Sequence, residues 1–361
     1  MPDLWNNPMQ TDGFEFVEYA APDPVALGAV FERMGLRPVA RHRQKNVTLY
    51  RQGDVNFVIN AEQDSFAQSF ARIHGPCVCA IAFRVRDAVA AYQRAIELGA
   101  WAVPSHPGPM ELNIPAIKGI GDSLIYLVDR YPGNQGDLSI YDVDFRWTSG
   151  EERRPPGVGL THVDHLTHNV HRGRMREWAE FYERLFEFRE LRYFDIEGKL
   201  TGLRSKAMVS PCGKIRIPIN ESADDRSQIQ EYLDAYHGEG IQHIALATDD
   251  IYATVERMRA QAVAFLDTPD TYYERVDQRV PGHAENIERL CTNRILIDGA
   301  PTEGGGLLLQ IFTKTVVGPI FFEIIQRKGN EGFGEGNFRA LFESIEADQV
   351  RRGVLSEPGR G

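Results

Sequence analysis

Two histidines and a glutamate, His165, His243 and Glu323, are the residues of this sequence whose types and spacing best fit a catalytic centre. Each lies in a strand-like run, and they follow one another at nearly equal separations of about 80 residues, as expected if each belongs to one copy of a repeated unit. A lone carboxylate in an apolar strand is costly unless it is paired or bound to a metal, and this makes Glu323 the residue most in need of an explanation. Two imidazoles and one carboxylate from neighbouring strands form a facial triad, which is typical of non-haem Fe(II) oxygenases. The pattern therefore predicts a metal centre.

Each of these three signals is weak when it is taken singly. A histidine on a strand is more often a packed or solvated side chain than a ligand, and a glutamate near a strand end is usually a surface charge. His237 precedes the strand of His243, and we expect it in a loop. Three further histidines are alternatives to His165 within HVDHLTHNVH and are expected at strand ends or in solvent: His162, His168 and His171.

An internal repeat spans the two halves of the chain and supplies the elements that must position the triad. Residues 14–36 resemble residues 165–187, residues 74–100 resemble 237–263, and LIYLVDR at 124–130 resembles FFEIIQR at 321–327. Each half is therefore predicted to hold two units of a strand, a helix and several strands. The first-half residues that align with the triad, Phe14 or Glu15, Ala80 and Tyr126, cannot bind a metal together, so only the second half should carry a site.

The local patterns agree with these units. Apolar residues recur at helical spacing in residues 89–98 and 251–262, and Asp87 and either Asp249 or Asp250 are expected to cap those helices. In KIRIPINES, Ile215, Ile217 and Ile219 alternate with Arg216, Pro218 and Asn220, as in a strand with two different faces. Such strands suit a curved sheet with helices outside and a cavity inside. The segment 146–159, rich in charge, Pro and Gly, is predicted to link the halves.

Composition excludes several classes of protein. The 361 residues suggest two domains, and 42% hydrophobic and 25% charged residues are ordinary for a globular enzyme. A net charge of −11 argues against binding nucleic acid or anionic lipid, and no window has the roughly 20 apolar residues of a membrane span. Because the first residues lack the pattern of a signal or transit peptide, we expect a cytoplasmic protein. The four cysteines form no CxxC pair and are expected to be reduced thiols.

The strings DHLTHNV, EFRELRYFDI, GLRSKAM, IPIN, SQIQEYL, GIQHIAL, TYY, LLLQIFT, FFEIIQRKG and GFGEGNF resemble the 4-hydroxyphenylpyruvate dioxygenase family of the vicinal oxygen chelate superfamily, over nearly the whole chain. This resemblance implies a homodimeric or homotetrameric enzyme of tyrosine catabolism that uses Fe(II) to convert 4-hydroxyphenylpyruvate and O2 into homogentisate and CO2. It implies an α+β fold of two tandem open β-barrels built from βαβββ modules. Residues 1–150 would form a barrel without a metal, for structure or assembly, and residues 151–361 the catalytic barrel with a C-terminal helix.

Carried over position by position, the family's iron ligands fall on His165, His243 and Glu323, in agreement with the repeat. The glutamines Gln228, Gln242 and Gln310 would take part in catalysis by fixing the substrate's phenol. Apart from the resemblance, the helical stripe of Phe338, Leu341, Phe342 and Ile345 predicts a C-terminal helix from Asn337 that acts as a gate over the cavity, the alternative being a helix docked permanently on the core. The family's substrate contacts fall on Ser205, Pro218, Asn220, Gln228, Gln242, Gln310, Phe312, Phe321, Phe333, Asn337 and Phe338.

Three alternatives remain at the level of sequence. Hydroxymandelate synthase takes the same substrate and metal but hydroxylates the benzylic carbon, and the aromatic Phe338 favours hydroxylation of the ring instead. An extradiol dioxygenase shares the fold and the triad, yet SQIQEYL and GFGEGNF are typical of the keto-acid enzymes. A non-catalytic protein that binds an aromatic ligand is expected to lack the triad, which is intact here.

Overall fold

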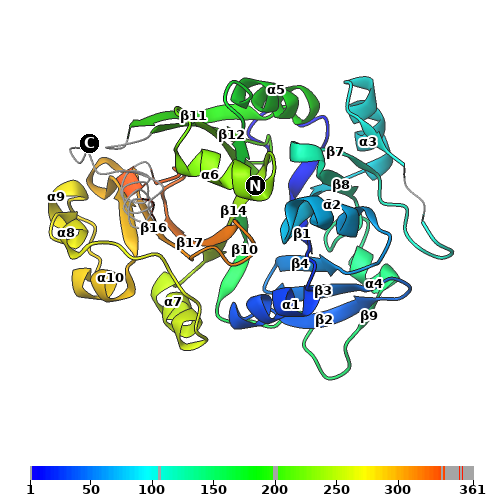
Figure 1. The fold of residues 1–361 in the computed structure, drawn as a ribbon, viewed down its shortest axis with the longest axis horizontal. Coiled ribbons are helices and arrows are strands. Elements are labelled where there is room, and N and C mark those ends of the chain that lie inside the picture. The colour runs from blue at the N-terminus through cyan, green and yellow to red at the C-terminus, as the bar shows by residue number, and fades with distance from the viewer. Residues whose placement is uncertain are drawn as a thin grey trace.

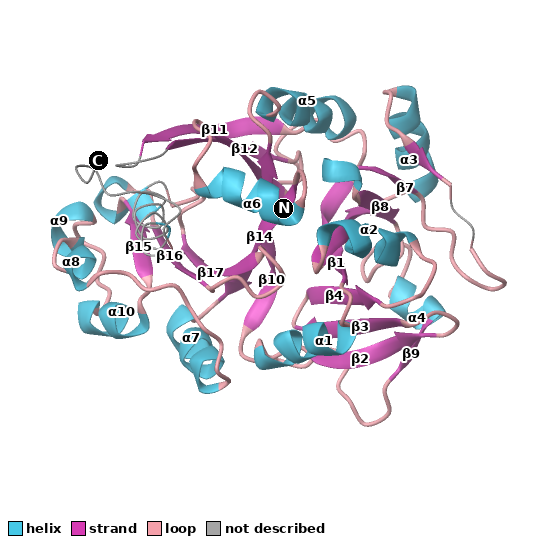
Figure 2. Cartoon of the chain, in the orientation of Figure 1, coloured by secondary structure: helices cyan, strands magenta, loops and turns pink. Residues whose placement is uncertain are grey.

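The computed structural model describes residues 2–104, 107–197, 202–334, 336–337, 349 and 352. Two mixed β-sheets dominate the fold, and helices lie along their outer sides (Figures 1 and 2). One sheet has nine strands in the order β6-β7-β8-β5-β1-β4-β3-β2-β9, and the other has eight in the order β11-β12-β13-β10-β14-β17-β16-β15. The predicted α+β fold of two tandem open barrels is therefore confirmed.

The first half contains two βαβββ modules in succession. The first module runs β1 (Thr11–Ala20), α1 (Pro24–Arg33), β2 (Arg37–His42), β3 (Val47–Gln52) and β4 (Val55–Asn60). Helix α2 (Phe66–His74) leads to the second module of β5 (Cys77–Val85), α3 (Ala88–Glu97), β6 (Ala102–Val103), β7 (Ala116–Lys118) and β8 (Leu124–Val128), with the 3-10 turn η1 (Ile120–Asp122) before β8. Helix α4 (Ile140–Asp144) and strand β9 (Phe145–Trp147) close this half.

The second half repeats the plan and extends its last module. Its first module runs β10 (Leu160–Val170), α5 (Met175–Phe186), β11 (Arg189–Glu197), β12 (Gly202–Val209) and β13 (Arg216–Ser222), followed by α6 (Gln228–Tyr236). The second runs β14 (Gly240–Thr248), α7 (Ile251–Ala260), β15 (Leu296–Gly299), β16 (Leu307–Phe312) and β17 (Phe321–Lys328). Between α7 and β15 lie α8 (Asp270–Tyr273), α9 (Val276–Arg279) and α10 (Ile287–Asn293), and η2 (Pro301–Glu303) precedes β16.

Local sequence signals set the boundaries of these elements. Asp87 caps α3 by accepting a hydrogen bond from the Ala90 amide, and Asp250 caps α7 in the same way, so Asp250 is the cap of the two candidates. The interhalf linker is shorter than predicted, because Phe145–Trp147 form β9 and pair with β2. The C-terminal helix predicted from Asn337 onward lies almost entirely outside the described residues. Among the described residues, no helix is long and apolar enough to cross a membrane.

One continuous hydrophobic core joins the two halves. It contains buried residues from both sheets, and aromatic side chains meet across the boundary, with the Phe57 and Phe322 rings stacked at 5.7 Å and the Phe83 ring 5.3 Å from Phe186. The cysteines are all free, and Cys77 and Cys79 are buried in this core, as expected of packed thiols.

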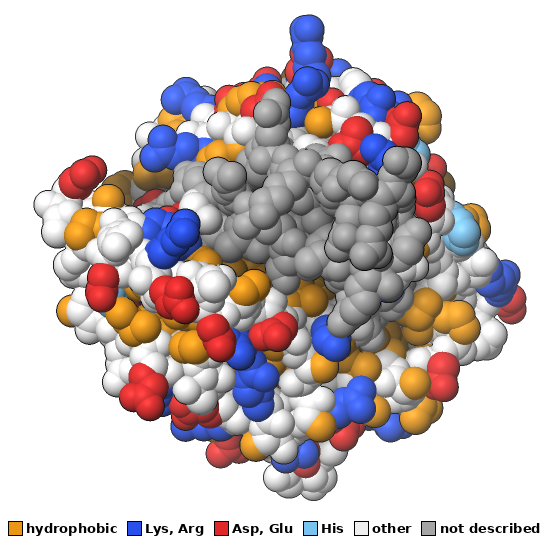
Figure 3. Space-filling view, turned by 60° about the vertical axis from the view of Figure 1, so that its left-hand side comes forward, with side chains coloured by type: hydrophobic (Ala, Val, Ile, Leu, Met, Phe, Trp, Pro, Cys, Tyr) orange, Lys and Arg blue, Asp and Glu red, His pale blue; other side chains and the backbone are white. Residues whose placement is uncertain are grey.

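On the face shown in Figure 3, acidic and basic side chains are interspersed. This distribution agrees with the inference from the net charge that the protein attracts polyanions only weakly.

Candidate metal centre

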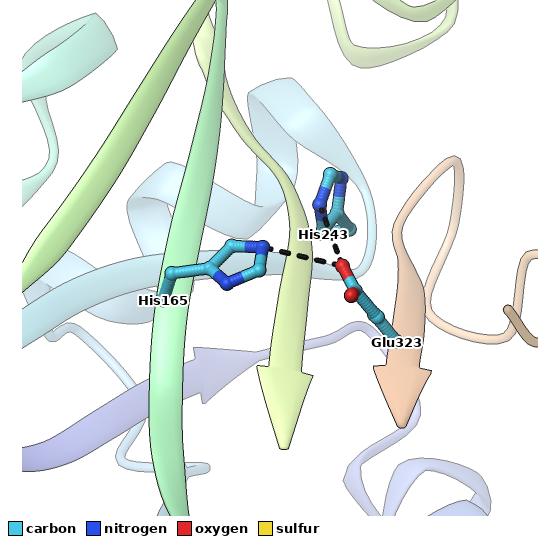
Figure 4. Close-up of side chains that lie close together, drawn as sticks. All are labelled: His165, His243 and Glu323. Atoms are coloured by element: carbon cyan, nitrogen blue, oxygen red, sulfur yellow. Dashed lines mark ion pairs between the residues drawn. The ribbon is translucent and has the colours of Figure 1, made fainter. Parts of the chain in front are cut away.

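His165, His243 and Glu323 come together inside the second sheet, from three neighbouring strands (Figure 4). Their ligand atoms lie within 4.8 Å of one another, and all three side chains are buried. Nε2 of His165 lies 3.2 Å from Oε2 of Glu323, and Nε2 of His243 lies 3.5 Å from the same oxygen. Three ligand atoms this close can touch one ion, so the sequence-based grouping of the three residues agrees with the geometry.

Two β-bulges explain how the two histidines face the same cavity. Along the β10 and β14 pairing, Val163 lies opposite Leu246 and His165 opposite Ala245, so Asp164 is an extra residue on β10. Further along, Thr167 lies opposite His243 and His168 opposite Ile241, so Gln242 is an extra residue on β14. Bulges re-aim side chains and are common beside active sites. Here each bulge places a buried polar residue directly beside a histidine of the triad.

The charges of the triad suit a cation. Burial alone would raise the pKa of Glu323, but the charge of His165 and hydrogen bonds from both histidines lower that pKa to about 2, so the carboxylate is ionised. Burial lowers the pKa of His243 and opposes protonation. At His165 burial acts in the same direction, but the Glu323 and Asp164 carboxylates outweigh it and raise its pKa. The three residues therefore present one anionic oxygen and two imidazoles, and a metal would bind the neutral form of each imidazole.

Hydrogen bonds hold Glu323 in place from the side of β16. The Gln310 side-chain amide donates to Oε1 of Glu323 at 2.7 Å and to the Phe333 carbonyl at 3.3 Å. Asn337 donates in turn to Oε1 of Gln310 at 3.0 Å, and the Tyr272 hydroxyl donates to Asn337 Oδ1 at 2.7 Å. Gln310 and Asn337, which the resemblance assigned to the substrate pocket, thus lie in one chain of hydrogen bonds that begins at the triad.

Aromatic rings line the histidine side of the centre. The Phe321 ring stacks on His243 at 4.8 Å, and the Phe312 ring lies 6.4 Å from the same imidazole. Phe333 meets His165 edge to face at 5.5 Å and is only 2% exposed. These rings make an apolar wall that keeps water away from the triad.

A row of unpaired polar groups runs across β12, β13 and β10. Ser205 lies directly opposite Asn220, and Asn220 directly opposite Asn169. The Ser205 hydroxyl, the Asn220 side-chain oxygen and both polar atoms of Asn169 are buried without a hydrogen-bond partner among the described residues. Buried polar groups in native proteins are nearly always hydrogen-bonded, so this row calls for a ligand or ordered water.

Of the other candidates in the described part of the chain, Gln242 contacts a histidine of the triad directly, and Pro218 and Gln228 do not. Pro218 is buried two residues before Asn220, and Gln242 places its side-chain oxygen 3.2 Å from Nδ1 of His243. Gln228 is the first residue of α6 and is half-buried, and among the described residues no contact joins it to the triad. Phe338 lies outside the described residues.

The histidines considered as alternatives to the ligands differ from one another in burial and in contacts. His162 and His171 are exposed, as expected, and His237 ends α6 with a left-handed backbone. The expectation for His168 was wrong, because it is fully buried within β10 and its Nε2 is hydrogen-bonded to the Tyr182 hydroxyl at 2.7 Å. Burial lowers the pKa of His168 to about 3, so it is a neutral core residue on the opposite face of the strand from His165.

The first half carries the same strand pattern without the triad. Phe16 lies opposite Ala82, as His165 lies opposite Ala245, and Tyr126 pairs with Ala82 as Glu323 pairs with Ala245. The predicted counterpart of His165, Phe14 or Glu15, is therefore corrected to Phe16. The stretch from this residue to the following helix is longer in the second half (His165 to Met175) than in the first (Phe16 to Pro24), so an ungapped alignment of strand and helix is displaced on the strand. The Phe16 and Tyr126 rings lie 5.7 Å apart, with Phe16 in an apolar cluster, where the second half has its polar centre.

Sequence reasoning missed five residues that the geometry places around the centre, among them Thr167, whose hydroxyl lies 2.9 Å from Nε2 of His243. The five are Asp164, Thr167, Asn169, Tyr272 and Arg327. Asp164 and Asn169 stand in the quoted string DHLTHNV, and Tyr272 in TYY, so the resemblance covered them without giving them a role. The alternation of β10 from His165 would have placed Asn169 on the ligand face. Arg327 likewise stands in the quoted string FFEIIQRKG, but strand alternation does not predict the contacts of Arg327 or Tyr272, because these contacts join segments far apart in the chain.

Comparison with known proteins agrees with this geometry. The family profile described as "Hydroxyphenylpyruvate dioxygenase, HPPD, N-terminal" matches residues 5–146, and that of the "Glyoxalase/Bleomycin resistance protein/Dioxygenase superfamily" matches residues 160–276. A protein of Vibrio vulnificus named hemolysin VllY is 62% identical, with 97% of this chain and 98% of the relative covered. A 4-hydroxyphenylpyruvate dioxygenase of Pseudomonas aeruginosa is 61% identical over the same shares. Among solved structures, a mutant 4-hydroxymandelate synthase from Streptomyces coelicolor is 28% identical, with a TM-score of 0.79 over 94% of this chain and 99% of that one.

Proposed function

The chain belongs to the 4-hydroxyphenylpyruvate dioxygenase family, and we propose that it uses Fe(II) to convert 4-hydroxyphenylpyruvate and O2 into homogentisate and CO2. The observation that carries this proposal is the buried cluster of His165, His243 and Glu323. Two imidazoles and one carboxylate are the donor set of non-haem ferrous oxygenases, and an ionised Glu323 whose ion pairs among the described residues are with His165 and His243 fits a bound cation. When bound, the ferrous ion supplies open positions for the keto acid and O2.

The protein's own residues would bind and orient the substrate. The unpaired groups of Ser205, Asn220 and Asn169 are the available partners for its polar atoms, and a substrate placed there would satisfy them. Phe312, Phe321 and Phe333 would pack against the aromatic ring and exclude water from the reacting atoms. Gln310 would hold the Glu323 carboxylate at a fixed angle. The catalytic roles of Gln228 and Gln242 stay predictions from the resemblance.

Replacing Asn169 with alanine is expected to lower kcat/KM for 4-hydroxyphenylpyruvate by about 2- to 10-fold, because a hydrogen bond between neutral groups contributes about 0.5–1.5 kcal/mol. Steady-state O2 consumption measures this effect. Asn60→Ala is the matched control, since Asn60 lies on β4 in the first half and its side chain bonds Glu18 at 2.8 Å. Unchanged kcat/KM in Asn169→Ala would place the substrate elsewhere in the cavity.

O2 uptake by the purified chain, with Fe(II) and 4-hydroxyphenylpyruvate supplied, tests the proposed function. We expect uptake that needs both additions and a product that chromatography identifies as homogentisate. Hydroxymandelate as the product would instead make the chain a synthase, the activity named for its structural neighbour. Binding of the keto acid without O2 uptake would indicate a non-catalytic binding protein. Either result would overturn the proposal.

We also propose that the two halves have different functions. The apolar cluster around Phe16 in the first barrel fits a role for residues 1–150 in structure and assembly. We propose a homodimer or homotetramer, and light scattering on the purified chain distinguishes these from a monomer. The cytoplasmic location stays a prediction from the sequence.

A further inference from the structure

We propose that Asp164 and Arg327 are positioning residues that orient His165 toward the metal and tie the loop of residues 330–333 to the same centre. This inference rests on the proposed metal centre, but it concerns two side chains that do not touch the substrate. They link three parts of the second half: the bulge of β10, the end of β17, and the loop that carries Phe333.

The first link runs from the carboxylate to the imidazole. Oδ1 of Asp164 lies 2.8 Å from Nδ1 of His165, and both residues are 2–3% exposed. In the neutral imidazole, an Nδ1 that donates to this carboxylate leaves the lone pair of Nε2 available for a metal, and Nε2 is the nitrogen that faces Glu323. A carboxylate behind a ligating histidine fixes both its tautomer and its ring angle, and loss of such a partner commonly costs 10- to 100-fold in metal affinity.

The second link runs from the carboxylate to the loop. Nε and Nη2 of Arg327 each lie 2.8 Å from an oxygen of Asp164, a two-pronged pair buried beside the centre. The remaining nitrogen, Nη1, donates to the Asn330 carbonyl at 3.0 Å and to the Gly332 carbonyl at 2.5 Å. Arg216 adds a longer contact of 3.4 Å to Asp164 and an ion pair of 2.5 Å to Glu331. The position of Phe333 against His165 is therefore fixed through the same carboxylate that fixes His165.

The first half contains a similar acid and arginine pair, which allows a purely structural role of such a pair to be distinguished from a role in orienting a metal ligand. Glu15 is the extra residue of the equivalent bulge on β1, since Phe14 lies opposite Phe83 and Phe16 opposite Ala82. It is equally buried and pairs with Arg84 at 2.5 Å. The residue next to Glu15 is Phe16, where Asp164 has His165. An acid and arginine pair at this bulge thus belongs to both barrels, and only the second barrel places a histidine against it.

The experiment compares Asp164→Asn with Glu15→Gln in the full chain. Co(II), whose visible absorption reports coordination, is titrated into the metal-free proteins. We expect Asp164→Asn to bind Co(II) about 10- to 100-fold more weakly than wild type and with an altered spectrum. Glu15→Gln should bind with wild-type affinity and spectrum, although it breaks an ion pair of the same kind.

Wild-type affinity and spectrum in Asp164→Asn, or equal weakening in both variants, would overturn the positioning role. Failure of the wild type to bind Co(II) would instead overturn the proposed metal centre, so the two failures are distinguishable. Arg327→Lys provides a second route if Asp164→Asn does not fold. It keeps the charge but cannot hold the carboxylate and both carbonyls, so we expect faster amide hydrogen exchange in residues 330–333. Unchanged exchange there would rule out the tie to the loop.

Discussion

Replacing Glu323 with glutamine is expected to abolish iron retention and to lower kcat/KM by at least about a thousandfold, or about 4 kcal/mol in activation free energy. The amide keeps the shape of the side chain but removes the one anionic ligand of the cluster. It also places a second side-chain amide against that of Gln310, whose NH2 group donates to the Glu323 carboxylate in the wild type. Iron per chain after desalting and O2 consumption measure the two effects.

Glu18→Gln is the matched control for this variant. Glu18 is a buried glutamate on β1, in the equivalent sheet of the first half, and it accepts a hydrogen bond from Asn60 at 2.8 Å. Because burial raises the pKa of Glu18 and it belongs to no metal-binding cluster among the described residues, its neutral replacement should leave iron and turnover unchanged. Retention of iron and activity by Glu323→Gln would show that the ligand assignment is wrong.

The repeated modules were predictable because hydrophobic periodicity and chain order are local properties. Alternation in residues 215–220 predicted β13 and its inward face, and the aspartates Asp87 and Asp250 predicted where two helices begin. The grouping of His165, His243 and Glu323 followed from the repeat, although the three residues come from two modules and not from three. His165 and His243 lie on the equivalent first strands β10 and β14, and Glu323 lies on β17, the last strand of the β14 module. These three strands are neighbours in the second sheet, and so the triad meets.

The details that tune the centre were not predictable, since they depend on register and on contacts between distant segments. The connection between the first strand and its helix differs in length between the halves, so an ungapped comparison took Phe14 or Glu15 instead of Phe16 as the counterpart of His165. The burial of His168 involves Tyr182 of α5, whose hydroxyl is hydrogen-bonded to Nε2 of an imidazole that the sequence alone places in solvent. The pair of Asp164 and Arg327 joins two modules across the sheet.

Replacing Phe322 with alanine is expected to lower the free energy of unfolding by about 3–5 kcal/mol, the usual cost of emptying a buried aromatic site. Phe322 is fully buried and lies on the face of β17 opposite to Glu323. Its ring stacks on Phe57 of β4, so the loss falls on the core that both halves share. Urea unfolding followed by fluorescence and circular dichroism measures the change.

Phe66→Ala on α2 is the control, because that ring is 37% exposed, so its removal should cost about 1 kcal/mol or less. If the shared core makes the halves unfold together, Phe322→Ala shifts one common transition for both probes. Separate transitions, with only one of them moved, would show that the halves are energetically independent despite the contact of Phe57 and Phe322. Because Phe322 faces away from the triad, folded Phe322→Ala should still bind iron, which separates a loss of stability from a loss of the metal centre.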